Sequence, residues 1–143
     1  EGPLDGDGRR SLYIKFQLME APRFLSAFNL PGGKLTQGRR EASNTPAQSL
    51  AMLNDPLVWR LADHWAERLV AEPADDPAAR IEGMFQRALG RNPTAEERER
   101  WLSALRSLAT ARGLSNEDLS RDPALWADLA HAMFNLQEFL FIP

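Results

Sequence analysis

The sequence predicts an all-α protein: a helical bundle of about four to five helices, preceded by a basic N-terminal segment that is irregular or contains a short extended stretch. Three observations favour this fold. Helix-start sequences recur after residue 45, apolar residues between them follow the helical period, and glycines stand where helices end. We expect a single domain over residues 1–143, with the mostly irregular basic segment over 1–44 and the bundle over 45–143.

The basic N-terminal segment gives the weakest structural signal. Apolar and polar residues alternate over residues 12–18, which is typical of a strand, although part of the pattern also fits a helical stripe. We expect an extended stretch there, and the helical alternative stays open. Residues 22–28 are expected to form a short helix, which the LPGGK turn at residues 30–34 ends.

The first clear helix is predicted over residues 45–54. Thr45 and Gln48 form a capping box, in which the threonine hydroxyl accepts the Gln48 amide hydrogen and the glutamine side chain reaches back to Thr45. Pro46 suits the first helical position, because its missing N–H costs nothing there. The NDP sequence at residues 54–56 ends this helix and caps the next one.

Helix-start and helix-stop residues place the rest of the bundle. An Asp-Pro pair starts three helices, and Thr94 with Glu97 starts another through a second capping box. Gly90 and Gly113 stand at helix C-termini, and residues 114–121 leave room for one more helical turn. The predicted helices cover residues 56–71, 77–89, 94–112 and 123–140.

Each of these helices carries an apolar stripe that we assign to the core rather than to a cofactor site. The stripe residues are Leu57, Leu61, Trp65 and Leu69; Ile81, Met84, Phe85, Ala88 and Leu89; Trp101, Leu105 and Leu108; and Leu125, Leu129, Met133, Phe134 and Leu140.

Composition excludes several classes of site and partner. The chain has no cysteine and two distant histidines, so we expect no disulfide, no metal site and no cofactor. A net charge of −3 argues against nucleic-acid binding, and no apolar run is long enough to span a membrane. The charge is uneven, since residues 9–40 hold seven basic side chains against one acidic, whereas residues 51–143 hold 10 against 15.

Two groups of polar residues are candidate sites. Arg39 and Arg40 precede a helix N-terminus, where guanidinium and free N–H groups can bind an anion; alternatively, they pair with acidic residues of the protein itself. A predicted polar face of the last helix could act as a general base or bind a metal, or it could simply face water. Its residues are Asp128, His131, Asn135 and Glu138. We identify no catalytic motif and assign no catalytic residue.

Four motifs together resemble one known family. They are GRRSLY at residues 8–13, GRREASNTPAQSLAMLNDP at 38–56, RALGRNPTAEE at 87–97 and HAMFNLQEFLFIP at 131–143. This combination resembles the C-terminal domain of unknown function 1553 (DUF1553) of large exported multidomain proteins from planctomycetes and related bacteria. The resemblance nominates the polar residues within its motifs for anion or partner binding. These are Arg9, Arg10, Arg39, Arg40, Asn44, Gln48, Asn54 and Asp55.

The resemblance also implies a setting. Such domains form the C-terminal part of an exported polypeptide, which is periplasmic or lies at the cell surface. A cytochrome-c-like segment often precedes them. This chain has no CxxCH motif, so we expect no covalent haem. Family genes lie near sulfatase-like and glycan-degrading functions, which implies an acidic or sulfated polysaccharide as partner. We expect a non-catalytic binding or assembly module that contacts upstream domains of its own polypeptide. The alternative is a composite hydrolase or redox site that those domains complete.

Overall fold

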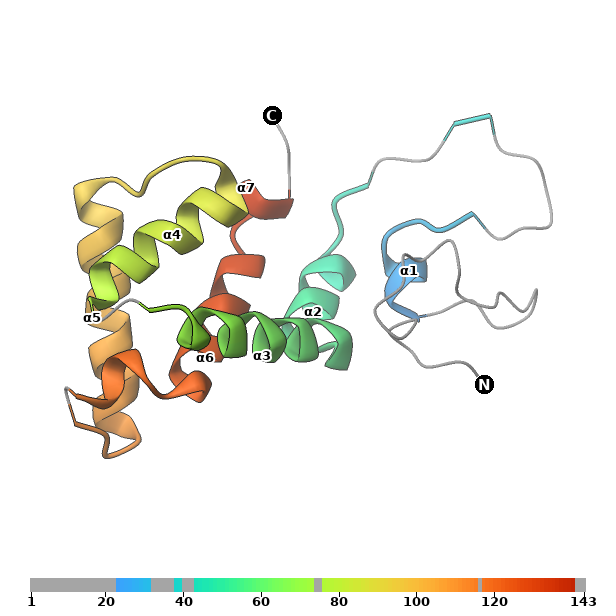
Figure 1. The fold of residues 1–143 in the computed structure, drawn as a ribbon. Helices are drawn as coiled ribbons and strands as arrows, with labels where there is room; N and C mark the ends of the chain where they lie inside the picture. Colours follow the sequence, from blue (N-terminus) through green and yellow to red (C-terminus); the bar gives the residue numbers. More distant parts are fainter. Residues whose placement is uncertain (1–22, 32–37, 40–42, 74–75, 116, 141–143) are drawn as a thin grey trace. The chain divides into compact units, whose positions relative to one another are not determined.

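The computed structural model describes residues 23–31, 38–39, 43–73, 76–115 and 117–140 (Figure 1). Every regular element in these ranges is helical and no strand occurs in them, so the protein is all-α, as predicted. The extended stretch predicted at residues 12–18 lies outside the described residues. The chain divides after Leu57 into two compact units, residues 1–57 and 58–143.

In the unit over residues 1–57, α1 covers Arg23–Ala27, which confirms the predicted short helix, and α2 covers Pro46–Asn54. Asn29 ends α1 with a left-handed φ of 58°, a conformation that asparagine tolerates better than most residues. Its side chain donates to the Ser43 hydroxyl at 2.6 Å, and this hydroxyl also accepts from Gln48 at 3.2 Å. One small polar cluster therefore links α1 to α2.

The helices of the unit over residues 58–143 begin and end almost where the sequence predicts. In chain order they are α3 (Pro56–Ala71, which starts just before the unit boundary), α4 (Pro77–Leu89), α5 (Ala95–Ala111), a 3₁₀ turn (Asp118–Ser120), α6 (Pro123–Phe134) and α7 (Gln137–Leu140). Asp76, Thr94 and Asp122 are N-caps, as predicted, and each side chain accepts a backbone N–H of the first turn. Gly90 and Gly113 follow α4 and α5 at a φ of 70°, which only glycine adopts without cost.

The core of this unit lies among α3, α4, α5 and α6, and Trp126 fills its centre with no exposed surface. Its indole N–H donates to the Leu119 carbonyl at 2.8 Å, so the 3₁₀ turn is tied to α6. The core face predicted for α3 was partly wrong. Val58 and Ala62 are buried where Leu57 and Leu61 were expected, and Leu61 is 52% exposed. In α3 the smaller apolar residues face the core, and a stripe chosen from the large apolar residues does not include them.

The prediction of one helix over residues 123–140 was also wrong, because the chain leaves the helix after Phe134 and starts α7 at Gln137 (Figure 1). The Asn135 side chain donates to the His131 carbonyl at 2.8 Å, while its backbone N–H turns to the Ala132 carbonyl at 3.1 Å. An asparagine side chain that takes over a helical acceptor in this way competes with the backbone, which favours a helix end.

Candidate functional site: a pocket of aromatic and arginine side chains

The motif residues nominated near the N-terminus are only partly described by the structure. Arg9, Arg10 and Arg40 lie outside the described residues, while Arg39 and Asn44 are exposed. Of the four nominated arginines the structure describes Arg39 alone, and the anion site before α2 stays a prediction.

The remaining nominated residues shape the ends of α2. The Gln48 side chain is buried and accepts the Thr45 N–H at 3.2 Å, which completes the predicted reach back to the cap. The Gln48 N–H itself bonds to the Thr45 carbonyl at 3.0 Å. Asn54 donates to the Leu50 carbonyl at 3.0 Å, and Asp55 accepts the Leu57 N–H at 2.9 Å. These contacts give Gln48, Asn54 and Asp55 structural roles.

The polar face predicted on the last helix does not form. Asp128 pairs with Arg112 at 2.6 Å, and His131 is buried, with its ring stacked on Trp59 at a centroid distance of 3.8 Å. Asn135 caps the end of α6, and Glu138 belongs to α7, where it binds Arg91. The break between the two helices removes the common face that a continuous helix would have given these side chains.

A different group of side chains forms a pocket of about 280 Å³ in the unit over residues 58–143. We call it the aromatic–arginine pocket. Its volume lies just below the roughly 300–1,000 Å³ of small-molecule pockets, so it suits one ring-sized group. The lining residues are Trp65 and Arg68 from α3, Arg87 and Ala88 from α4, Phe134 from α6 and Phe139 from α7.

Three aromatic rings form a continuous row along the aromatic–arginine pocket. Trp65 stacks against Phe134 at a centroid distance of 5.4 Å, and Phe134 meets Phe139 at 5.2 Å. Both distances fall in the range in which aromatic pairs attract each other beyond simple burial. Phe139 is 37% exposed, so the row reaches the surface. The row offers an apolar surface to a flat ligand.

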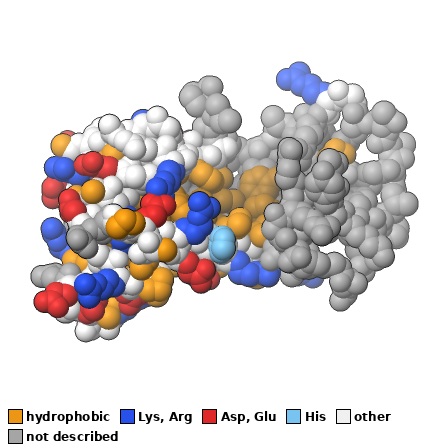
Figure 2. All heavy atoms as spheres, in the orientation of Figure 1, with side chains coloured by type: hydrophobic (Ala, Val, Ile, Leu, Met, Phe, Trp, Pro, Cys, Tyr) orange, Lys and Arg blue, Asp and Glu red, His pale blue; other side chains and the backbone are white. Residues whose placement is uncertain are grey.

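Two arginines give the aromatic–arginine pocket its charge. Arg68 forms no ion pair with any of the described residues, whereas Arg87 contacts Glu72 at 2.5 Å. The hydrogen bond from Arg87 lowers the pKa of Glu72, with help from the charges of Arg87, Arg68 and Arg80. On the face that Figure 2 shows, basic and acidic side chains intermingle over the described residues.

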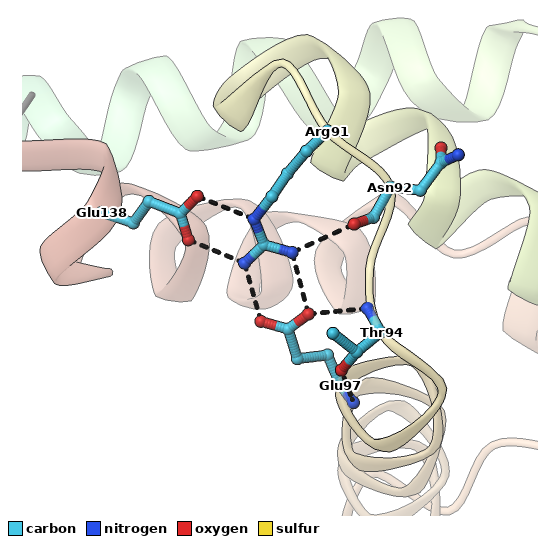
Figure 3. A network of polar contacts seen from close by, with 5 residues as sticks. All are labelled: Arg91, Asn92, Thr94, Glu97 and Glu138. Carbon is cyan, nitrogen blue, oxygen red and sulfur yellow. Dashed lines mark hydrogen bonds and ion pairs between the residues drawn. The ribbon is translucent and has the colours of Figure 1, made fainter. Parts of the chain in front are cut away.

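Arg91 binds Glu138 of α7, the helix that also contains Phe139. Figure 3 shows the contacts of Arg91 with Glu138 and Glu97. Its guanidinium donates two hydrogen bonds to Glu138 of α7, both at 2.7 Å, and two to Glu97 of α5, at 2.7 and 2.9 Å. Such bidentate pairs restrain geometry as well as adding energy. Hydrogen bonds from Arg91 lower the pKa of Glu138 and, with the Thr94 N–H, hold the pKa of Glu97 at about 2. One side chain thus ties α7 to the start of α5.

The side chains that line the aromatic–arginine pocket are apolar or cationic. Its six described lining residues include no carboxylate, imidazole or hydroxyl group that could transfer a proton or attack a substrate. Within the described ranges, no group of three or more His, Asp or Glu side chains could hold a metal ion. None of the helices described is long and apolar enough to cross a membrane.

Sequence reasoning missed this pocket, although it found some of its members. Trp65, Ala88 and Phe134 were assigned to the core, and they do contact its edge. One available signal was the spacing of Trp65 and Arg68, which places a large ring and a cation on one side of a helix. The positions of Arg87 and Phe139 beside them depend on tertiary packing.

Comparisons with known proteins define the family. The family model described as PSD1, Protein of unknown function (DUF1553), matches residues 3–105. Three of the four sequence motifs lie within this match, and the motif at residues 131–143 lies beyond it. Comparisons with curated proteins and with solved structures give no match.

Proposed function

The chain belongs to the DUF1553 family of proteins of unknown function, and from this premise we propose that it is a non-catalytic binding module for an acidic or sulfated polysaccharide. The observation that carries the proposal is the pairing of a row of aromatic rings with two arginines in one ring-sized pocket. The apolar face of a sugar ring packs on aromatic side chains, and a carboxylate or sulfate group accepts hydrogen bonds from guanidinium.

The wider setting of this function rests on the family resemblance. We propose that the chain closes an exported bacterial protein of the planctomycete type and contacts upstream domains of the same polypeptide. The basic segment over residues 9–40 is proposed as a second contact for the same polysaccharide, through Arg9, Arg10, Arg39 and Arg40. The apolar and cationic lining of the aromatic–arginine pocket supports this binding role. In the alternative, a composite hydrolase or redox site, the upstream domains would supply the catalytic groups.

The first prediction tests the pocket with a matched pair of double variants. Arg68→Ala/Arg87→Ala should weaken binding of a galacturonic acid disaccharide at least about tenfold, because two charge-assisted contacts are lost. The control, Arg100→Ala/Arg106→Ala, removes the same charge from the exposed surface of α5 and should leave the affinity nearly unchanged. Isothermal titration calorimetry measures both, with circular dichroism to check the fold.

Three comparisons decide between the outcomes. The matching disaccharide of galactose, which carries no charge, should bind more weakly than the acidic one. Affinity for the acidic disaccharide should fall as salt rises, since exposed charges are screened over about 8 Å at physiological ionic strength. Equal losses in the two double variants would contradict the assignment of binding to this pocket.

A further inference from the structure

Arg87 does not face the solvent alone in the aromatic–arginine pocket. Its Nη2 atom lies 2.5 Å from Oε2 of Glu72, and both side chains are about half exposed, at 48% and 46%. Glu72 does not line the aromatic–arginine pocket itself but stands just beyond the end of α3, four residues after Arg68. A carboxylate of the protein is therefore already paired with one of the two guanidinium groups that line the pocket.

The backbone of Glu72 makes two hydrogen bonds that do not involve its carboxylate. Its carbonyl accepts from Nη2 of the buried Arg80 at 3.3 Å, and its N–H donates to the Arg68 carbonyl at 3.3 Å. The Arg80 guanidinium in turn lies over the Trp126 ring, 5.0 Å from its centroid. Rotation about the Glu72 side-chain bonds breaks none of these contacts, so the carboxylate can leave Arg87 without any rearrangement of the fold.

We propose that Glu72 is an internal competitor, whose carboxylate occupies Arg87 while the pocket is empty and is displaced by the acidic group of the ligand. This inference rests on the proposed function and adds a mechanism of selectivity to it. An anionic ligand replaces one carboxylate–guanidinium pair by another. A neutral ligand offers Arg87 only uncharged oxygen acceptors, which form weaker hydrogen bonds than a carboxylate does, so it leaves the internal pair in place.

The test compares two substitutions that each remove one negative charge from a half-exposed ion pair. Glu72→Gln keeps the size and the backbone of Glu72 but weakens its hold on Arg87. Glu82→Gln is the matched control, because Glu82 pairs with Arg98 at 3.4 Å and both of these side chains are 44% exposed. Titration calorimetry with the galacturonic acid disaccharide gives the affinity of each variant of the 143-residue chain.

We expect Glu72→Gln to tighten binding by about two- to fivefold, the range for loss of one exposed ion pair that competes with the ligand. Glu82→Gln should change the affinity by much less, which separates local competition from the general effect of net charge. In the Arg87→Ala background most of the gain should disappear, since no guanidinium remains for which Glu72 and the ligand compete.

The outcomes separate this inference from the function on which it rests. If the parent chain binds and Arg68→Ala/Arg87→Ala weakens binding, but Glu72→Gln binds no more tightly than Glu82→Gln, the competitor is excluded and the binding site stands. A gain from Glu72→Gln that persists fully without Arg87 also excludes the competitor. If neither the parent chain nor Glu72→Gln binds the acidic disaccharide, the proposed function and the competitor both fail.

Discussion

At the residue scale, the carboxylate of Glu97 takes part in two different interactions. It accepts the Thr94 N–H at 2.7 Å as the far half of a capping box, and it accepts two hydrogen bonds from Arg91. The capping half was predictable, because the Thr-x-x-Glu spacing is local. The hydrogen bonds from Arg91 depend on the conformation of the loop between α4 and α5, and the spacing of residues in the sequence does not predict that conformation.

These hydrogen bonds predict a loss of stability in acid. The pKa of Glu97 is lowered from 4.5 to about 2, mainly by the hydrogen bond from Arg91. A carboxyl group with a lowered folded-state pKa stabilises the fold above its unfolded pKa, and this stabilisation is lost as pH falls through the folded value. The stability contributed by Glu97 should therefore disappear between pH 4.5 and about pH 2.

Urea unfolding of the parent chain and of Glu97→Gln measures this contribution. The parent should be the more stable near neutral pH, and the difference in free energy of unfolding should shrink toward zero as the pH approaches about 2. A difference that stays constant over this range would show that the ionised carboxylate is not what stabilises the fold.

At the element scale, capping residues predict where helices start, whereas side-chain hydrogen bonds and packing determine where some of them end. Asp76, Thr94 and Asp122 start their helices as predicted, because each cap is a contact within one turn. The end of α6 was missed, since it depends on the Asn135 side chain taking the His131 carbonyl, an exchange that the apolar periodicity of the segment does not reveal.

The same break makes α7 a separate four-residue helix, and we predict that Glu138 keeps it in place. A helix this short is not stable by itself, so its contacts must hold it. Glu138→Gln should weaken the pair with Arg91 and speed hydrogen exchange of the backbone amides in α7, with little change in the core of α5.

The control for α7 is Glu96→Gln, which weakens an exposed pair with Arg100 at 3.8 Å within α5. It should leave exchange in α7 unchanged. Hydrogen exchange followed by mass spectrometry or NMR compares the two variants directly. Unchanged exchange in α7 of Glu138→Gln would mean that the aromatic contacts of Phe139 hold the helix without the ion pair.

At the scale of the whole molecule, fold class and site differ in how far sequence predicts them. The all-α fold follows from caps and periodicity, which are local signals that repeat along the chain. The aromatic–arginine pocket draws one or two residues from each of four helices, α3, α4, α6 and α7, and forms only when these helices are packed. Trp65 and Phe134 were expected in the core for a sound reason, since half-buried pocket aromatics and core aromatics share one periodicity.

Two of the four tryptophans can report directly on ligand binding in the aromatic–arginine pocket. Trp65 lines the aromatic–arginine pocket, whereas Trp126 is fully buried with its indole N–H bound to the Leu119 carbonyl. The measurement is an NMR titration of the indole N–H signals with the galacturonic acid disaccharide. If the disaccharide binds in the aromatic–arginine pocket, the Trp65 signal should shift to saturation, the Trp126 signal should hardly move, and Arg68→Ala/Arg87→Ala should abolish the Trp65 shift. A Trp65 signal that stays unmoved while the disaccharide binds elsewhere on the chain would contradict binding in this pocket.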